Sequence, residues 1–376
     1  MKLAIPRETV PGETRVAATP ESVKKFKGLG LEVTVEAGAG AYARIADADY
    51  AAAGATIAPD ARAALADADI VLKVRGPNAA ESALLKKGAV VAAMLAPHTE
   101  KAAIATLAGQ GATAFAMEFL PRISRAQAMD VLSSQSNLAG YKAVIDAAAT
   151  FGRAMPMMMT AAGTIAPARV LVMGVGVAGL QAIATAKRLG AIVSATDVRP
   201  ATKEQVESLG GTFVAVMDEE FKNAQTAGGY AKEMSAEYQA KQAALIAETI
   251  KKQDIIITTA LIPGRKAPVL VSEEMIKTMK PGSVIVDLAA EAGGNTPLTK
   301  AGEVVEVHGV TIMGYSNLPG RLAVDASSLY ARNLFNFVSL LVDKKTGALA
   351  IDWNDEIVKG ALVAKDGELV HPAVKS

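Results

Sequence analysis

The sequence contains no cysteine among its 376 residues. This absence excludes disulfide frameworks, thiol nucleophiles and thiolate zinc sites, and we predict no metal site. Aromatic residues make up only 4% of the chain, which argues against a base-stacking surface for nucleic acid. The net charge of +1 provides no basic footprint for nucleic acid or anionic lipid.

Long hydrophobic runs are also missing. The longest apolar stretch, Val170 to Ala186, contains three glycines and Gln181, and it is typical of a strand, a turn and a helix rather than a membrane span. The first residues, Met1 to Glu8, reach charged side chains too early for a secretory signal. We therefore expect a cytoplasmic protein.

Short apolar strands alternate with amphipathic helices along the N-terminal third of the chain, which predicts parallel βαβ units covered by helices. The predicted strands are Lys2–Pro6, Leu31–Glu36, Asp69–Val74, Ala89–Leu95 and Thr113–Met117. The predicted helices are Glu21–Leu29, Ala61–Ala66, Glu81–Lys86 and Lys101–Gln110.

A second α/β unit begins near Ala168, and long helices at Ala126–Phe151 and Ala323–Leu341 are predicted to carry the chain across and back. Its later strands are predicted at Ala191–Thr196, Thr212–Val216, Asp254–Thr259, Ser283–Leu288 and Val310–Gly314. The tail contains Asp366-Gly367, which favours a type I′ hairpin turn. The first domain is therefore predicted to be discontinuous and built from both ends of the chain.

A dinucleotide fingerprint, Gly174-x-Gly176-x-x-Gly179, follows a predicted strand and opens a predicted helix. The three glycines allow a tight turn, close approach of a diphosphate and close helix–strand packing, with the diphosphate at the positive end of the helix. Asp197 ends the next strand, where a carboxylate binds the adenosine ribose and disfavours a 2′-phosphate. NAD is therefore preferred over NADP, although Arg199 could stack on adenine or hold a phosphate.

These patterns predict two Rossmann-like α/β domains with parallel sheets, the first discontinuous, joined by long helices. We place the first domain at residues 1–132 plus 324–376. The NAD-binding Rossmann domain is placed at residues 133–323.

The stretch Arg122-Ile-Ser-Arg-Ala-Gln127-Ala-Met-Asp130, with Ser133 soon after, gathers an arginine, an amide, a carboxylate and a hydroxyl within about three helical turns. A nicotinamide carboxamide needs such donors and acceptors beside a pocket wall. Alone, the stretch is more typical of a helix start with a solvated polar face. Together with the fingerprint it indicates an enzyme that handles NAD.

Two charged features have structural alternatives. The segment Pro6–Glu21 is expected to be a solvated loop that leads into a proline-started helix. Lys73 lies inside an apolar strand, so we expect its amine to reach a cleft or a partner carboxylate.

Two further segments leave their interpretation open. Gln225–Ser235, with Gly229, Tyr230 and Met234, is predicted to be a hinged flap or an inert surface loop. Pro156–Thr164 carries three consecutive methionines and is predicted to be a hairpin arm. Since successive strand residues face opposite ways, the three methionines cannot share one core face. Either a dimer partner covers one side of the arm, or the segment is an ordinary core strand buried on both sides.

Histidine is scarce: the only ones are His98, His308 and His371, none of them beside these motifs. Oxidation of an alcohol or amine needs a group that takes the substrate proton. Hydride passed directly between two nicotinamides needs positioning and little acid–base catalysis. The scarcity of histidine is consistent with such a reaction.

The sequence resembles the alanine dehydrogenase and pyridine nucleotide transhydrogenase superfamily. The resemblance spans essentially the whole chain and rests on the N-terminal Pro-Arg-Glu…Glu-Thr-Arg-Val-Ala…Pro pattern and on the fingerprint with Asp197. The 122–130 stretch, Ser-Ser-Gln-Ser-Asn-Leu-Ala-Gly-Tyr and Ala-Gly-Gly-Tyr-Ala-Lys-Glu-Met narrow it further. They look like the NAD(H)-binding alpha subunit (domain I) of proton-translocating NAD(P) transhydrogenase.

The resemblance implies a function for each motif. Arg122, Gln127, Asp130 and Ser133 would surround the nicotinamide end, with Gln127 reaching the partner and helping to set the hydride distance. The implied cofactor-binding residues are Ser124, Gly174, Val175, Gly176, Val177, Gly179, Asp197, Val198, Arg199, Gly229, Tyr230, Met234, Gln242 and Leu261. The reaction would be Re/Si-specific hydride transfer between NAD(H) here and NADP(H) on a partner, coupled to proton translocation.

The resemblance also implies partners. Such proteins are homodimers that dock an NADP(H)-binding domain of the beta subunit and associate peripherally with the inner membrane. A membrane-spanning, proton-conducting subunit would lie on another chain, as in bacteria with a split alpha subunit.

Two alternatives remain: an NAD-dependent alanine dehydrogenase and a non-enzymatic NAD(H) sensor. The chain resembles alanine dehydrogenases at Arg15 and Lys73, which there bind the substrate carboxylate. Their histidine is replaced here by Met94, and their aspartate before a Gly-Gly pair by Glu291. These departures argue against pyruvate reduction, so we expect Arg15 and Lys73 to be ion-paired scaffold residues. The intact 122–130 set argues against a sensor.

Overall fold

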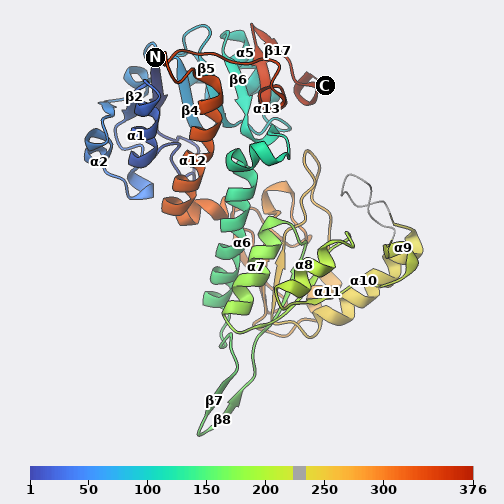
Figure 1. Ribbon diagram of the computed structural model, residues 1–376. Coiled ribbons are helices and arrows are strands. Elements are labelled where there is room, and N and C mark those ends of the chain that lie inside the picture. Colours follow the sequence, from blue (N-terminus) through green and yellow to red (C-terminus); the bar gives the residue numbers. More distant parts are fainter. Residues whose placement is uncertain (223–233, 376) are drawn as a thin grey trace. The chain divides into compact units, whose positions relative to one another are not determined.

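The computed structural model describes residues 1–222 and 234–375 (Figure 1). Contacts divide the chain into an outer unit formed by residues 1–135 and 319–376, called the terminal unit, and a central unit formed by residues 136–318. Helix α6 (Val131–Thr150) begins in the terminal unit and continues in the central unit. The chain returns at the 3₁₀ helix η5 (Leu318–Leu322), so α12 (Ala323–Leu341) lies wholly in the terminal unit.

The terminal unit is built on an eight-stranded sheet in the order β17-β16-β6-β5-β4-β1-β2-β3, parallel from β3 to β6 and antiparallel at β16 and β17. Its strands are β1 (Lys2–Ile5), β2 (Glu32–Glu36), β3 (Thr56–Ala58), β4 (Ile70–Arg75), β5 (Val90–Met94), β6 (Thr113–Ala116), β16 (Leu362–Lys365) and β17 (Glu368–Leu369). Its other helices are α1 (Pro20–Gly28), α2 (Asp47–Ala52), α3 (Ala61–Leu65), α4 (Ala79–Ser82), α5 (Lys101–Gly109), α13 (Glu356–Ala361) and α14 (Pro372–Lys375), with 3₁₀ turns η1 (Ala41–Ala43), η2 (Met117–Phe119) and η3 (Ser124–Met129).

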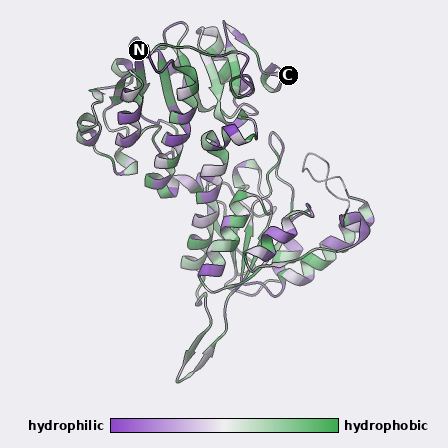
Figure 2. Ribbon diagram, viewed as in Figure 1, coloured by the Kyte–Doolittle hydropathy of each residue, from purple (hydrophilic) through white to green (hydrophobic). Residues whose placement is uncertain are grey.

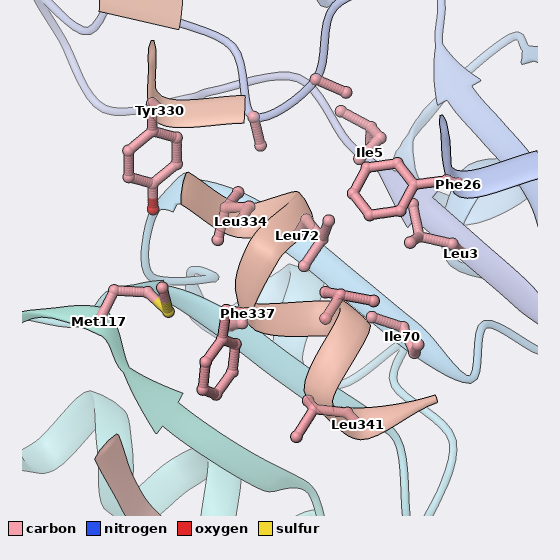
Figure 3. Close-up of a cluster of buried hydrophobic side chains, with 14 of the residues drawn as sticks. Leu3, Ile5, Phe26, Ile70, Leu72, Met117, Tyr330, Leu334, Phe337 and Leu341 are labelled. Carbon is pink, nitrogen blue, oxygen red and sulfur yellow. The ribbon is translucent and has the colours of Figure 1, made fainter. Parts of the chain in front are cut away.

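Helix α12 closes one face of this sheet. Its residues Leu334, Phe337 and Leu341 point toward the strands, where they meet side chains such as Leu72 and Ile70 of β4 (Figure 3). These residues are fully buried, and burying such a side chain contributes about 1.5–3 kcal/mol. Figure 2 shows that hydrophobic residues lie along the central strands of each sheet. Within the described residues, no helix has the length and apolar character that a membrane crossing requires.

The central unit carries a seven-stranded sheet in the order β11-β10-β9-β12-β13-β15-β14, with only β14 antiparallel. Its strands are β9 (Arg169–Met173), β10 (Ile192–Thr196), β11 (Thr212–Phe213), β12 (Ile255–Thr258), β13 (Val284–Asp287), β14 (Val304–Val307) and β15 (Val310–Met313). Its other helices are α7 (Val177–Arg188), α8 (Thr202–Ser208), α9 (Glu219–Lys222), α10 (Ala236–Ile250), α11 (Glu273–Lys277) and η4 (Ala290–Ala292). The parallel strands of each sheet follow the 3-2-1-4-5-6 order, which confirms the predicted Rossmann-like fold class.

The two predicted hairpins are confirmed. In the tail, Asp366 and Gly367 have φ angles of 52° and 88°, as a type I′ turn between β16 and β17 requires. In the central unit, β7 (Met158–Thr160) and β8 (Gly163–Ile165) pair antiparallel and project from the sheet of that unit (Figure 1).

Several element boundaries differ from prediction. The helix expected at Ala126–Phe151 is wrong at its start, because the chain forms the 3₁₀ helix η3 and leaves it at Asp130, whose side chain caps α6. The helix expected at Glu81–Lys86 is wrong at both ends: it spans only Ala79–Ser82, and its start is set by a capping box of Asn78 and Glu81. The strand expected at Thr212–Val216 ends at Phe213, and β3, β14 and α2 were not predicted.

Candidate functional site

The fingerprint glycines lie at the switch point of the sheet in the central unit, where β9 has β10 on one side and β12 on the other. Gly174 has a φ of +99°, and a Cβ there would lie 2.4 Å from Thr259 Oγ1. A Cβ on Gly179 would lie 1.9 Å from the carbonyl oxygen of Gly174. Among the described residues, a Cβ on Gly176 would meet nothing within 4 Å, so of the three only this glycine has open space beside it there.

That open space lies at the start of α7. The helix begins at Val177, and its N-cap, Gly176, offers no side-chain cap for the first N–H groups. Unsatisfied N–H groups and the helix dipole together favour an anion at this end. Val175 is buried below this turn, while Val177 is 40% exposed beside it. The cradle therefore fits a nucleotide diphosphate.

Asp197 follows β10 at the same edge of the sheet. Its carboxylate accepts hydrogen bonds from the backbone N–H groups of Val175 (2.7 Å) and Arg199 (2.9 Å). Arg199 Nε and Nη2 add two bonds of 2.8 Å. Burial raises the pKa of Asp197, but the bonds and charge of Arg199 outweigh it and hold the pKa below its usual range. Asp197 is therefore ionised at neutral pH.

The other predicted residues of the central unit lie on neighbouring segments. Gln242 of α10 accepts from Val216 N (2.8 Å) and donates to Thr196 Oγ1 (3.3 Å), which ties α10 to the end of β10 and to the segment after β11. The side chains of Val198 and Leu261, after β10 and β12, are exposed. Met234 accepts a bond at its carbonyl from Gln239, whereas Gly229 and Tyr230 lie outside the described residues.

Sequence reasoning missed a buried hydrogen-bonded cluster beside the loop that carries Leu261. Asp287 is fully buried and accepts from Thr258 Oγ1 (3.1 Å) and from the backbone N–H groups of Ala289 and Asn295. Asn295 binds both the N–H and the carbonyl of Ala260. In the sequence, the aspartate that ends the apolar strand Val-Ile-Val-Asp is a signal of this cluster.

The other predicted set belongs to the terminal unit and is arranged by η3. A 3₁₀ helix has three residues per turn, so residues i and i+3 share a face. Ala126 and Met129 share the buried face. Ser124 and Gln127 share another face and are exposed, as is Arg122 just before the helix. The backbone thus directs the Gln127 amide toward solvent.

Asp130 and Ser133 form a local capping pair. Asp130 Oδ1 accepts from Ser133 N (2.9 Å), and Asp130 Oδ2 accepts from the Ser133 hydroxyl (2.6 Å). An aspartate at this position stabilises the N-terminus of α6. The structure therefore brings Asp130 and Ser133 together, and it shows a capping role that prediction of one continuous helix concealed.

A buried cluster of charges occupies the switch point of the sheet in the terminal unit, where β1 and β4 lie side by side. Arg15 Nη2 pairs with Glu13 at 2.6 Å, and Arg75 Nε pairs with Glu13 at 3.0 Å. Glu13 and Arg15 are 5% and 3% exposed, so the expectation of a solvated loop is wrong at these residues. The expected proline-started helix is confirmed, since α1 begins at Pro20. Tertiary pairing offsets the cost of burying these charges. The expectation for Lys73 is confirmed, since its amine lies 2.7 Å from Glu81.

Two carboxylates of this cluster have shifted pKa values in opposite directions. Burial raises the pKa of Glu8 to about 7 although Lys73 and two backbone N–H groups favour its charged form. Burial also disfavours charge on Glu13, but the bonds and charges of Arg15 and Arg75 lower its pKa to about 2. Glu8 is therefore the group of this pair that titrates near neutral pH.

Glu8→Gln is expected to flatten the pH dependence of stability between pH 4.5 and 7. In that window folded Glu8 holds a proton that the unfolded chain has released, so the free energy of unfolding falls as pH rises. The shift corresponds to at most roughly 3 kcal/mol. Urea unfolding at several pH values measures it, with the exposed Glu32→Gln as control. A wild-type slope equal to that of Glu8→Gln would contradict the assignment.

Two family models match the chain: "Alanine dehydrogenase/PNT, N-terminal domain" over residues 4–139 and "Alanine dehydrogenase/PNT, C-terminal domain" over residues 143–372. The chain is 60% identical over its whole length to the first part of the NAD(P) transhydrogenase subunit alpha of Rhodospirillum rubrum, covering 99% of that protein. It superposes on the solved transhydrogenase of Sinorhizobium meliloti with a TM-score of 0.90 and 55% identity, covering 98% of this chain and all of that one. Identity to the alanine dehydrogenase of Halomonas elongata is 32%, over all of this chain and 96% of that protein.

Proposed function

The chain belongs to the alanine dehydrogenase/PNT family, and from this premise we propose that it is the NAD(H)-binding component of a proton-translocating NAD(P) transhydrogenase. The observation that carries the proposal is a nucleotide cradle in the central unit of a chain 60% identical to a transhydrogenase alpha subunit. Its reaction is direct hydride transfer between NAD(H) and NADP(H) held by a partner domain.

The residues of this chain bind and orient the nucleotide. Gly176 and the first turn of α7 receive the diphosphate, and Asp197 receives the adenosine ribose hydroxyls. We propose that Arg122, Gln127, Asp130 and Ser133 bind the nicotinamide end. When bound, the nicotinamide supplies or accepts the hydride. No substrate proton has to be moved, so the work of these side chains is to fix orientation and distance.

Alanine dehydrogenase activity is the weaker alternative. Arg15 and Lys73, which resemble its carboxylate-binding residues, are already paired with Glu13 and Glu81. Met94, in place of its histidine, has a thioether that offers no proton to a substrate.

We propose that the β subunit supplies the NADP(H)-binding domain and that a membrane-spanning subunit conducts protons, so that this chain joins the inner membrane peripherally. We also propose a homodimer. Met157, Met159 and Ile165 of the β7–β8 arm are 56%, 78% and 38% exposed. The alternative of a two-sided core strand is therefore wrong, and apolar side chains on both sides of an arm favour cover by a second copy.

Asp197→Asn is expected to weaken NADH binding about tenfold and to reduce the preference over NADPH. The neutral amide loses the charged acceptor for the ribose hydroxyls, and it no longer repels a 2′-phosphate. Calorimetric titration with both nucleotides measures the change. The exposed Glu303→Gln of the central unit is the control for a lost charge, and an unaltered NADH/NADPH affinity ratio would remove Asp197 from nucleotide selection.

Hydride transfer in solution tests the proposed function. The chain is mixed with a purified NADP(H)-binding domain of a related transhydrogenase, NADPH and an NAD⁺ analogue of shifted absorbance. Rapid reduction of the analogue without a third substrate is expected. No reduction by a domain shown to bind both the analogue-loaded chain and NADPH would overturn it, and alanine oxidation by the chain alone would support the dehydrogenase alternative.

A further inference from the structure

Two asparagines of α12 bind one backbone carbonyl, that of Ala128, the residue after Gln127. Asn333 Nδ2 and Asn336 Nδ2 each donate to this oxygen over 2.9 Å. A carbonyl oxygen has two lone pairs, so both acceptor positions of Ala128 are used. The backbone beside Gln127 is therefore fixed by a helix more than two hundred residues later in the chain.

The core of the terminal unit fixes the place of these asparagines. Leu334, Phe337 and Leu341 anchor α12 on the sheet (Figure 3). Asn333 and Asn336 are one helical turn apart and share the side of α12 that packs on η3. Asn333 is 7% exposed, and its Oδ1 accepts from the Ser134 hydroxyl at 2.7 Å. Both the oxygen and the nitrogen of its amide are thus engaged, which holds the side chain in one orientation.

A chain of hydrogen bonds extends from Asn333 to the buried charges. Gln135 Nε2 donates to Ser134 Oγ (3.3 Å) and to the carbonyl of Ala326 (3.1 Å). Gln135 Oε1 in turn accepts from Arg15 Nη1 at 2.9 Å. Arg15, already bound to Glu13, therefore supports the elements that hold Ala128.

The other side of Gln127 has its own anchor. Arg125 donates to Asp355 through Nη1 (2.5 Å) and Nη2 (3.0 Å), a bidentate arrangement that fixes orientation as well as distance. Asp355 is the N-cap of α13 and accepts from Ile357 N at 2.7 Å. Positions 125 and 128 are thus both fixed, and Gln127 lies between them.

On the basis of the proposed function, we propose that Asn333, Asn336 and Asp355, the Gln127 clamp, are positioning residues for hydride transfer. They touch neither nucleotide in this role and act through the backbone that carries Gln127. Hydride transfer depends steeply on the approach of the two rings, and a displacement of about 1 Å can slow such a step by about a hundredfold. The clamp therefore acts on the transfer rate and not on NADH affinity.

Asn336→Ala is the main test, because Asn336 is only half-buried and its loss leaves Ala128 one remaining donor. Single-turnover hydride transfer is expected to slow about tenfold with the Kd for NADH unchanged. In a Gln127→Ala background the same substitution is expected to cause no further slowing, since residues that act through one another are not additive. Arg125→Ala, which removes the other anchor, is expected to behave alike.

Ser339→Ala is the matched control, since it removes a hydrogen bond on α12 to the carbonyl of Phe335, within the helix. Slowing no greater than in this control, or additive slowing in the Gln127→Ala background, would overturn the clamp. If the wild-type chain transfers no hydride, the proposed function fails instead. Hydrogen exchange of amides 124–130 tests the anchoring separately: faster exchange in Asn336→Ala than in Ser339→Ala supports anchoring of the backbone beside Gln127, and equal exchange overturns the clamp.

Discussion

Gln127→Asn is expected to slow hydride transfer by about a hundredfold while NADH affinity stays nearly unchanged. The substitution shortens an exposed side chain by one methylene and keeps its amide. Its backbone position is set by the buried Ala126 and Met129 and by the bonds to Ala128, so the fold does not depend on the missing carbon. Under the proposed function, only the reach of the amide toward the reacting rings changes.

Stopped-flow transfer with a saturating partner domain measures the rate, and fluorescence titration measures NADH affinity. Gln110→Asn, the same change at an exposed position after α5, is the control. A transfer rate equal to that of the control would remove Gln127 from the mechanism. A rate loss matched by an equal loss of NADH affinity would make Gln127 a general binding residue.

Gly179→Ala is expected to destabilise the central unit by about 3 kcal/mol and to abolish NADH binding. The new Cβ would lie 1.9 Å from the carbonyl oxygen of Gly174 and 2.9 Å from its carbon. Both atoms are backbone, so the clash cannot be relieved by a rotamer change. Helix α7 would have to move away from β9 and open the turn that we propose receives the diphosphate.

Gly176→Ala is the matched comparison for this prediction. Its Cβ would meet no atom of residues 1–222 or 234–375 within 4 Å, so chemical unfolding is expected to match the wild type. NADH binding is still expected to weaken, because the methyl group occupies space that the diphosphate approaches. Equal stability of the Gly179→Ala and Gly176→Ala variants would contradict the packing role of Gly179.

The fold was largely predictable because its signals are local. Alternating apolar strands and helices, the glycine spacing at 174–179 and the Asp366-Gly367 turn each act within a few residues. Errors arose where a side chain at a helix end decided the boundary. Asp130 and Asn78 form caps that override the periodicity on which the predicted helices were based.

The candidate site was predictable to a limited extent for the same reason. The fingerprint predicts its own turn, because glycines at this fixed spacing adopt a fixed backbone geometry. Lys73 was visible because an amine inside an apolar strand needs a partner. The identity of that partner, Glu81, and the burial of Arg15 with Glu13 came only from the folded chain.

By itself, then, the sequence determined the α/β class and the tight turn at residues 174–179, because both are encoded by neighbours along the chain. It also indicated the polar set at 122–133 as a candidate site. Only the tertiary structure decided which charges are buried and what holds Gln127. Asn333, Asn336 and Asp355 lie some two hundred or more residues from the segment they bind. Such contacts form when two distant elements pack on one sheet, and no local pattern records them.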